Sequence, residues 1–214
     1  HKAIRRQRQM CIRDSYNIDD NKVEELVEQK HISNLLASIL VNRGITEEKE
    51  LEVFLNPTRK DFYDPFLLPD MEIAVDRIIK AVNNKEKIMI YGDYDADGIT
   101  SVSVLKKYLN QIGLETGEYI PNRLNEGYGL NKEAILKIYN MGYKLMVTVD
   151  CGISGLEEVE YANTLGIETI ITDHHEPAEQ LPNAIAVIDA KRKDNIYPFN
   201  QLAGVAVSYT HLRA

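Results

Sequence analysis

The segment from Ile88 to Ser101, IMIYGDYDADGITS, constrains the fold of this chain more than any other. It opens with a short apolar run typical of a buried strand, and from Ile99 to Ile112 it carries apolar residues at helical spacing up to a stop at Gly113. Between strand and helix lie three carboxylates at alternate positions, Asp93, Asp95 and Asp97. A strand, a turn and a helix form half of a βαβ unit, and ligands of open α/β sheets bind outside the carboxyl ends of the strands. The sequence therefore predicts a ligand site at these aspartates.

Four more apolar runs follow, and helical patterns separate most of them. These runs are Tyr119–Ile120, Lys144–Val149, Ile167–Thr172 and Ala184–Ile188. Strands that alternate with helices pair in parallel through right-handed crossovers. We therefore predict an α/β fold with a doubly wound, mainly parallel five-stranded sheet, preceded by a short helical segment. From these patterns we expect residues 16–69 to form this helical segment and a connection, and residues 70–207 to form the α/β domain.

The two ends of the chain do not continue these patterns. Residues 1–15 and 208–214 show no usable apolar period and resemble translated sequencing-adapter sequence. We predict that both ends are non-native tails that contribute nothing to the core. For residues 1–15, a disordered basic arm is the alternative interpretation.

Two further predicted strands also end in potential ligands. Asp150 follows the third strand, and Asp173, His174 and His175 follow the fourth. The carboxyl ends of parallel strands meet at one rim, and carboxylates this close repel one another unless a cation neutralises them. The alternative for an isolated Asp-Gly sequence is a solvated acidic loop with Asx turns. Carboxylates and imidazoles without thiolates favour Mn²⁺ or Mg²⁺ over zinc, and the carboxylates can bridge two ions.

Two such ions assist in-line displacement at phosphorus, and other residues suit the phosphate. Thr100 and Ser101 lie near the start of the predicted helix, where backbone amides bind anions. Arg123, in the loop PNRLNEGYG, is suited to binding a phosphate. The alternative interpretation is that this segment is simply a turn.

The formal charge of −8 is unevenly distributed. Outside residues 1–15 and Arg213, the chain holds 19 basic and 32 acidic residues, a net charge of −13. This acidity argues against a broad electrostatic grip on nucleic acid, though not against a local basic groove or a metal-bridged phosphate. No apolar run reaches the ~20 residues that span a membrane, and no leader is recognisable, so we expect a cytoplasmic location and no membrane partner. Cys11 and Cys151 give no disulfide framework.

The motifs carry a family resemblance. YGDYDADGITS, VTVDCGIS and TDHHE resemble the first three motifs of the DHH phosphoesterase superfamily, in the family's order. Within it, FLNPTRKDFYDPFLLPDM, IPNRLNEGYGLNKEAI and YPFNQLAGVAV resemble the RecJ family of single-strand-specific 5′ to 3′ exonucleases. The likeness extends from Asn17 to Val207. Two mild departures are Asp189-Ala190, where the family commonly has Asn-Pro, and Ala206, which replaces a frequent glycine.

The resemblance implies a role for each motif residue. Asp95, Asp97, Asp150 and His174 would ligate the metals, Asp93 would join them, and Asp150 would bridge. His175 would face the metals or the scissile phosphate, so the implied catalytic set is Asp95, Asp97, Asp150, His174 and His175. Asp173 would orient a histidine from outside the ligand set. Thr100, Ser101, Arg123 and His175 are the candidate substrate contacts.

The implied function is metal-dependent hydrolysis of phosphodiester bonds in single-stranded DNA during repair and recombination. The alternatives are a DHH hydrolase of oligoribonucleotides, cyclic dinucleotides or pyrophosphate, and an inactive DHH scaffold in a replication complex. Single-strand-binding protein and helicase partners are implied by the resemblance alone. The family's fourth-motif aspartate, second domain and oligonucleotide-binding fold would follow Val207. We therefore expect an N-terminal catalytic part that is weakly active or inactive by itself.

Overall fold

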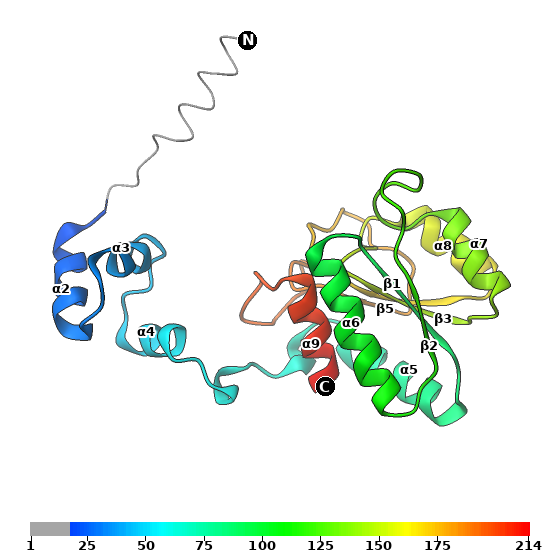
Figure 1. Ribbon diagram of the computed structural model, residues 1–214, viewed down its shortest axis with the longest axis horizontal. Coiled ribbons are helices and arrows are strands. Elements are labelled where there is room, and N and C mark those ends of the chain that lie inside the picture. The colour runs from blue at the N-terminus through cyan, green and yellow to red at the C-terminus, as the bar shows by residue number, and fades with distance from the viewer. Residues whose placement is uncertain (1–17) are drawn as a thin grey trace, which may run out of the picture. The chain divides into compact units, whose positions relative to one another are not determined.

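The computed structural model describes residues 18–214, which fall into two compact units that divide after Phe62 (Figure 1). The prediction for residues 1–15 lies outside the described range. Within that range, no helix is both long and apolar enough to cross a membrane.

The first unit is built from short helices. Their bounds are α2 Asp20–Lys30, α3 Asn34–Asn42 and α4 Glu48–Leu55, followed by the 3-10 turn η1 Arg59–Asp61. The side chains of Asp19 and Ser33 cap α2 and α3, because each accepts a backbone N–H from the first turn of its helix. Leu26, Leu40 and Leu51 are buried and form part of a small core. The predicted helical segment ahead of the sheet is confirmed.

The second unit is organised around a five-stranded sheet. Its strands are β1 Ile88–Gly92, β2 Thr116–Tyr119, β3 Leu145–Val149, β4 Glu168–Thr172 and β5 Ala186–Ile188. Every neighbouring pair is parallel, and the strand order is β2-β1-β3-β4-β5. The predicted doubly wound, five-stranded α/β fold is therefore confirmed.

Strand β2 begins earlier in the chain than the sequence indicated. We expected Tyr119–Ile120, whereas Thr116 already pairs with Ile88 and the strand ends at Tyr119. This strand lies at the edge of the sheet, and its residues TGEY are exposed or only half-buried. An edge strand does not require the continuous apolar run by which we identified the strands.

Helices cover both faces of the sheet (Figure 1). One face carries α5 Met71–Asn84, preceded by η2 Pro65–Leu67, together with α6 Ala96–Gln111 and α9 Gly204–Arg213; the other carries α7 Lys132–Asn140 and α8 Leu156–Thr164. Because successive strand residues point to opposite faces, β1 contributes to both cores. Ile88 and Ile90 pack on the α5, α6 and α9 side, and Met89 and Tyr91 on the α7 and α8 side. Packing on both faces therefore holds β1, and the acidic residues that follow it, in a fixed place next to β3.

Helix α6 begins at Ala96, earlier than the predicted Ile99. The side chain of Asp95 caps it by accepting the N–H groups of Asp97 at 2.8 Å and Gly98 at 3.0 Å. Glycine is required at position 98, since a Cβ there would lie 2.4 Å from the carbonyl oxygen of Asp93. Asp97 is consequently a residue of the first helical turn and not of a loop.

The expectation that residues 208–214 contribute nothing to the core is wrong in this structure. They extend α9, which packs along α6, and Leu212 and Ala214 pack against the core on this face. The helical continuation of Gly204–Val207 places these side chains on the buried side, although the segment itself lacks an apolar period. His211 is buried there, and neither ring nitrogen has a hydrogen-bond partner among the described residues.

We expect His211→Leu to stabilise the protein. A buried polar ring without partners costs about 1 to 3 kcal/mol, and leucine fills similar space without that cost. Burial lowers the pKa of His211 to about 4, below its ordinary 6.5, so the unfolded state binds the extra proton. The wild type should lose stability as the pH falls from about 6.5 to 4, and the variant should lose less. Thermal unfolding at pH 5 and pH 7.5 measures both effects, with His211→Asn as a polar control. An unchanged or lower melting temperature for the leucine variant would contradict the expectation.

Candidate metal centre

The predicted ligands gather at the carboxyl ends of β1, β3 and β4. Asp93 follows β1 directly, Asp150 follows β3, and Asp173 follows β4. The strand order reverses between β1 and β3, and ligands of open α/β sheets bind at such a switch point. Asp150 has a backbone φ of 60°, a left-handed conformation that turns the chain sharply at the rim.

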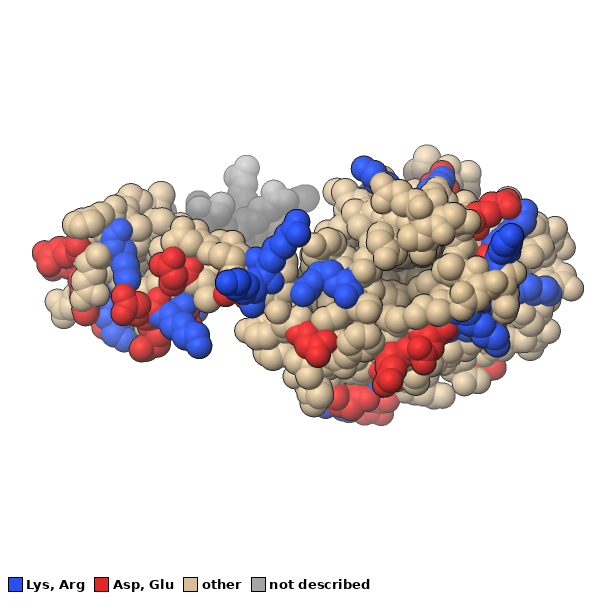
Figure 2. Space-filling model, turned by 90° about the horizontal axis from the view of Figure 1, so that it is seen from below, with Lys and Arg blue, Asp and Glu red and all other residues tan. Residues whose placement is uncertain are grey.

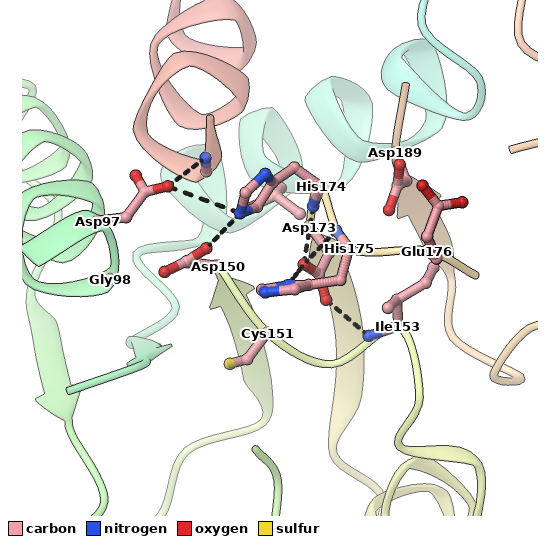
Figure 3. A network of polar contacts seen from close by, with 12 residues as sticks. Asp97, Gly98, Asp150, Cys151, Ile153, Asp173, His174, His175, Glu176 and Asp189 are labelled. Atoms are coloured by element: carbon pink, nitrogen blue, oxygen red, sulfur yellow. Dashed lines mark hydrogen bonds and ion pairs between the residues drawn. The ribbon is translucent and has the colours of Figure 1, made fainter. Parts of the chain in front are cut away.

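Two overlapping groups of ligand atoms lie close enough together to hold a cation. Asp93, Asp95 and Asp150 form one group, and within it the ligand atoms lie within 4.8 Å of one another. Asp150, His174 and His175 form the other, with the same spacing (Figure 3). We call these five residues the metal rim. Asp150 belongs to both groups, which is the arrangement that a bridging carboxylate requires.

Asp97 stands apart from both groups. Its oxygens accept the N–H groups of Gly204 at 2.8 Å and Val205 at 2.7 Å, at the start of α9, and one lies 3.6 Å from His174 Nε2 (Figure 3). The carboxylate therefore joins α9 to the rim. Its assignment as a metal ligand stays a prediction, and in this arrangement an ion would share Asp97 with two backbone amides.

The rim carboxylates carry an unbalanced negative charge. Burial, followed by repulsion from Asp97 and Asp95, raises the pKa of Asp150 to about 7, and burial also raises the pKa of Asp93. Oδ1 of Asp93 and Oδ1 of Asp150 are buried and accept no hydrogen bond among the described residues. Asp150 Oδ1 does lie 3.0 Å from His174 Nε2, without hydrogen-bond alignment. Buried oxygens without donors, aimed at one region, fit a divalent cation.

Asp173 holds the histidine segment in place. Its Oδ1 lies 2.7 Å from His175 Nδ1 and accepts the His174 amide at 2.7 Å, and its Oδ2 accepts the Ile153 amide at 2.9 Å (Figure 3). These bonds lower the pKa of Asp173 although burial opposes them, and the Asp173 carboxylate raises the pKa of His175. Asp173 therefore favours a charged, oriented His175 ring and has no oxygen left to face an ion.

The candidate substrate residues differ in their access to the rim. The Ser101 hydroxyl is buried and donates to the carbonyl of Asp97. The Thr100 hydroxyl donates to the carbonyls of Ala96 and Asp97. Because α6 begins at Ala96, neither residue lies at the helix end where free amides would bind a phosphate. Arg123 lies in the loop after β2, with its Cζ 5.3 Å from the centre of the Tyr94 ring.

Three residues near the rim were not predicted from the sequence: Tyr94, Tyr128 and Gly204. The Tyr128 hydroxyl lies 3.2 Å from His175 Nε2, and the Tyr94 and Tyr128 rings meet edge to face at 6.5 Å. A Cβ on Gly204 would lie 2.6 Å from Asp150 Oδ1, so only glycine lets α9 approach the rim this closely. Tyr128 and Gly204 lie in two of the segments that carry the family resemblance, which was the signal available for them.

The comparison with known families decides where the chain belongs. Residues 87–213 match the family described as "DHH family, N-terminal domain", a range that contains every rim residue. The chain belongs to the DHH family. Its DHH domain thus covers the sheet and α6 to α9, whereas the helices of the first unit and α5 precede it.

Several RecJ exonucleases resemble this DHH chain. The single-stranded-DNA-specific exonuclease RecJ of Bacillus subtilis (strain 168) is 47% identical over 191 residues, which cover 89% of this chain and 24% of that protein. A crystal structure of exonuclease RecJ bound to manganese superposes with a TM-score of 0.62 at 32% identity, over 68% of this chain and 37% of that one. RecJ of Thermus thermophilus in complex with Mn²⁺ gives a TM-score of 0.65 at 25% identity, over 90% and 26% of the two chains. The DHH chain thus spans about a quarter of the length of the B. subtilis relative.

Asp189 is a buried acid at the edge of this DHH site, at the end of β5. Its Oδ1 accepts the Lys191 amide at 2.7 Å, while its Oδ2 is buried without a partner among the described residues. Burial, opposed by Lys191 and assisted by the nearby Asp173 and Glu176 charges, raises the pKa of Asp189 to about 7. Asp189 is therefore protonated at neutral pH far more often than an exposed aspartate.

We expect Asp189→Asn to stabilise the metal-free protein at pH 8. The folded-state pKa of about 7 exceeds the ordinary 3.8, so the folded state keeps a proton that the unfolded state has already lost. Stability should fall as the pH rises from about 4 to 7. Asparagine removes this pH-dependent loss, which is on the order of 4 kcal/mol at pH 8. Urea unfolding at pH 4.5 and pH 8 in the presence of a chelator measures it. The same pH slope in both proteins would show that Asp189 titrates normally.

Proposed function

We propose that this chain is the catalytic part of a Mn²⁺- or Mg²⁺-dependent phosphoesterase that hydrolyses single-stranded DNA from its 5′ end. The observation that carries the proposal is the rim itself, where buried carboxylate oxygens without donors and two histidines converge at the switch point of the sheet. The 47% identity to the B. subtilis single-stranded-DNA-specific exonuclease supports DNA as the substrate.

The residues divide into three roles under this proposal. Asp93, Asp95 and Asp150 would hold one ion and Asp150 with His174 a second, with Asp97 completing the set. When bound, the two ions would activate a water and stabilise the entering and leaving oxygens of an in-line displacement. Because no side-chain nucleophile is required, the buried Cys151 beside Asp150 has no role in the chemistry.

His175 supplies proton transfer and charge. Asp173 raises its pKa, so the ring is cationic over more of the neutral pH range than a free histidine. A charged imidazole facing the phosphate stabilises the negative charge that develops and can donate a proton to the departing oxygen. Nδ1 is bound to Asp173, so the proton would be exchanged at Nε2, which lies 3.2 Å from the Tyr128 hydroxyl.

Two labelled substrates test the proposal. Single-stranded DNA labelled at the 5′ end should release a labelled mononucleotide with Mn²⁺, whereas the same DNA labelled at the 3′ end should give a ladder of shortened products. Duplex DNA of the same sequence should resist hydrolysis. A ladder from the 5′-labelled strand would reverse the polarity. Hydrolysis of short oligoribonucleotides, cyclic dinucleotides or pyrophosphate alone would favour the other DHH hydrolases. Metal binding without any hydrolysis, even when the chain is joined to the remaining sequence of B. subtilis RecJ, would favour the scaffold.

A further inference from the structure

The loop between β2 and α7 connects the edge of the sheet to the metal rim. We call residues 121–130 the rim loop. It carries Arg123 and Tyr128, and the Tyr128 hydroxyl lies 3.2 Å from His175 Nε2. Gly127 and Gly129 flank Tyr128 with φ values of 78° and 80°, a conformation in which other residues are strained. The position of Tyr128 therefore depends on what holds the loop at its base.

A single carboxylate ties the base of the rim loop together. Glu126 accepts the Asn122 amide at 2.7 Å, and the other oxygen accepts a short hydrogen bond from the Tyr119 hydroxyl. Lys137 on α7 donates to the same Glu126 oxygen at 3.0 Å and to the Tyr119 hydroxyl at 3.2 Å. Only 14% of the Glu126 side chain is exposed. The Asn122 amide, then Tyr119 and Lys137, lower the pKa of Glu126 to about 2, so the group stays charged throughout the working pH range.

The far end of the loop is fixed separately through β1. Tyr91 donates its hydroxyl to the carbonyl of Gly129 at 2.9 Å and receives the Asn131 side-chain amide at 3.2 Å. The Tyr91 ring stacks on Tyr119 with their centres 5.3 Å apart. Glu126 and Tyr91 thus hold the two ends of the loop, and the stacked tyrosines connect both anchors to β1, which is followed by Asp93 of the rim, and to its neighbour β2.

We propose that Glu126, held by Tyr119 and Lys137, is a positioning residue that fixes the rim loop so that Arg123 and Tyr128 lie beside the metal rim. The part of this inference that concerns DNA rests on the proposed function. Glu126 touches neither the rim nor a substrate directly; it acts through the loop. A misplacement of about 1 Å in a positioning element can reduce a rate by about a hundredfold, so a defect here should be measurable.

Loop placement is measured without metal or DNA by hydrogen exchange. Glu126→Ala is compared with the wild type and with Glu133→Ala, an exposed glutamate on α7. We expect amide exchange over residues 122–130 to be at least about tenfold faster in Glu126→Ala, with β1, β3 and α7 unchanged. Loop exchange in Glu126→Gln should be intermediate between the wild type and Glu126→Ala, because glutamine keeps one acceptor oxygen and loses the charge. Unchanged loop exchange, or faster exchange across the whole sheet, would overturn the positioning role.

Measurements of Mn²⁺ affinity, KM and kcat distinguish a positioning role of Glu126 from a role in metal binding. In Glu126→Ala the calorimetric Mn²⁺ affinity should stay within about twofold of the wild type. The KM for single-stranded DNA should rise at least about tenfold, more than kcat changes. If the wild type cleaves DNA, equal KM values for the wild type and Glu126→Ala would overturn the inference. If DNA is not cleaved even when this chain is joined to the remaining sequence of B. subtilis RecJ, the proposed function fails, and loop exchange alone still decides the role of Glu126.

Discussion

Mutation of Asp150 to alanine is expected to abolish measurable Mn²⁺ binding and any hydrolysis that depends on it. Asp150 is the one residue shared by both candidate ligand groups, and it is 2% exposed. Its removal takes a ligand from each ion at once. Loss of ions that lower a barrier by several kcal/mol corresponds to a rate decrease on the order of a thousandfold. Calorimetric titration with Mn²⁺ and a single-strand hydrolysis assay measure the two effects.

Asp150→Asn is the matched variant. Asparagine tolerates the left-handed backbone at this position better than alanine, keeps the shape of aspartate and removes the charge. Because the folded-state pKa of about 7 lies above the ordinary 3.8, Asp150 destabilises the metal-free fold increasingly as the pH rises from about 4 to 7. The metal-free Asn variant should therefore melt at a higher temperature than the wild type at pH 8, and Mn²⁺ should no longer stabilise it. Indistinguishable Mn²⁺ isotherms for wild type and both variants would refute the site.

The central part of the fold was predictable because its signals are local and strong. Strands β1 and β3 are buried throughout, and β4 is buried from Thr169 to Thr172, so their sequences are rich in apolar residues, and the acidic residues after them mark the rim. The convergence of Asp93, Asp150 and Asp173 required only parallel pairing and strand order. The edge strand β2 was predicted too late in the chain because its half-buried residues do not form an apolar run.

What the sequence could not provide were contacts between distant segments. Nothing near Asp97 indicates that both its oxygens accept amides from Gly204 and Val205, far along the chain. The position of Ser101 depended on where α6 begins, and the Asp95 cap moved that start by one turn. Side-chain orientation at Tyr128 depends on the Glu126 network. These are tertiary features that no local periodicity encodes.

The second large effect concerns how DNA is held. We expect residues 1–214 alone to hydrolyse single-stranded DNA at least about a hundredfold more slowly than the same residues joined to the remaining sequence of B. subtilis RecJ. Single strands are bound by basic grooves and stacking surfaces along several nucleotides. On the face of the second unit seen in Figure 2, acidic and basic side chains are interspersed, without a continuous basic track. The net charge of −13 outside residues 1–15 and Arg213 also disfavours the binding of a long, negatively charged phosphate backbone.

Both proteins contain the same five rim residues, but the chimera also gains the family's fourth-motif aspartate, so Mn²⁺ affinity is measured in both. The chimera should show the lower KM and the higher kcat on 5′-labelled DNA. Similar Mn²⁺ affinities would assign this difference to DNA positioning, and a higher affinity in the chimera would assign part of it to the added aspartate. The Asp150→Asn chimera identifies any contaminating nuclease. Equal rates for the two proteins would show that Arg123, Tyr128 and the rim are sufficient to hold the substrate. A slow rate that persisted in the chimera would instead locate the deficiency in this chain, first at Asp97, whose oxygens are already engaged by α9.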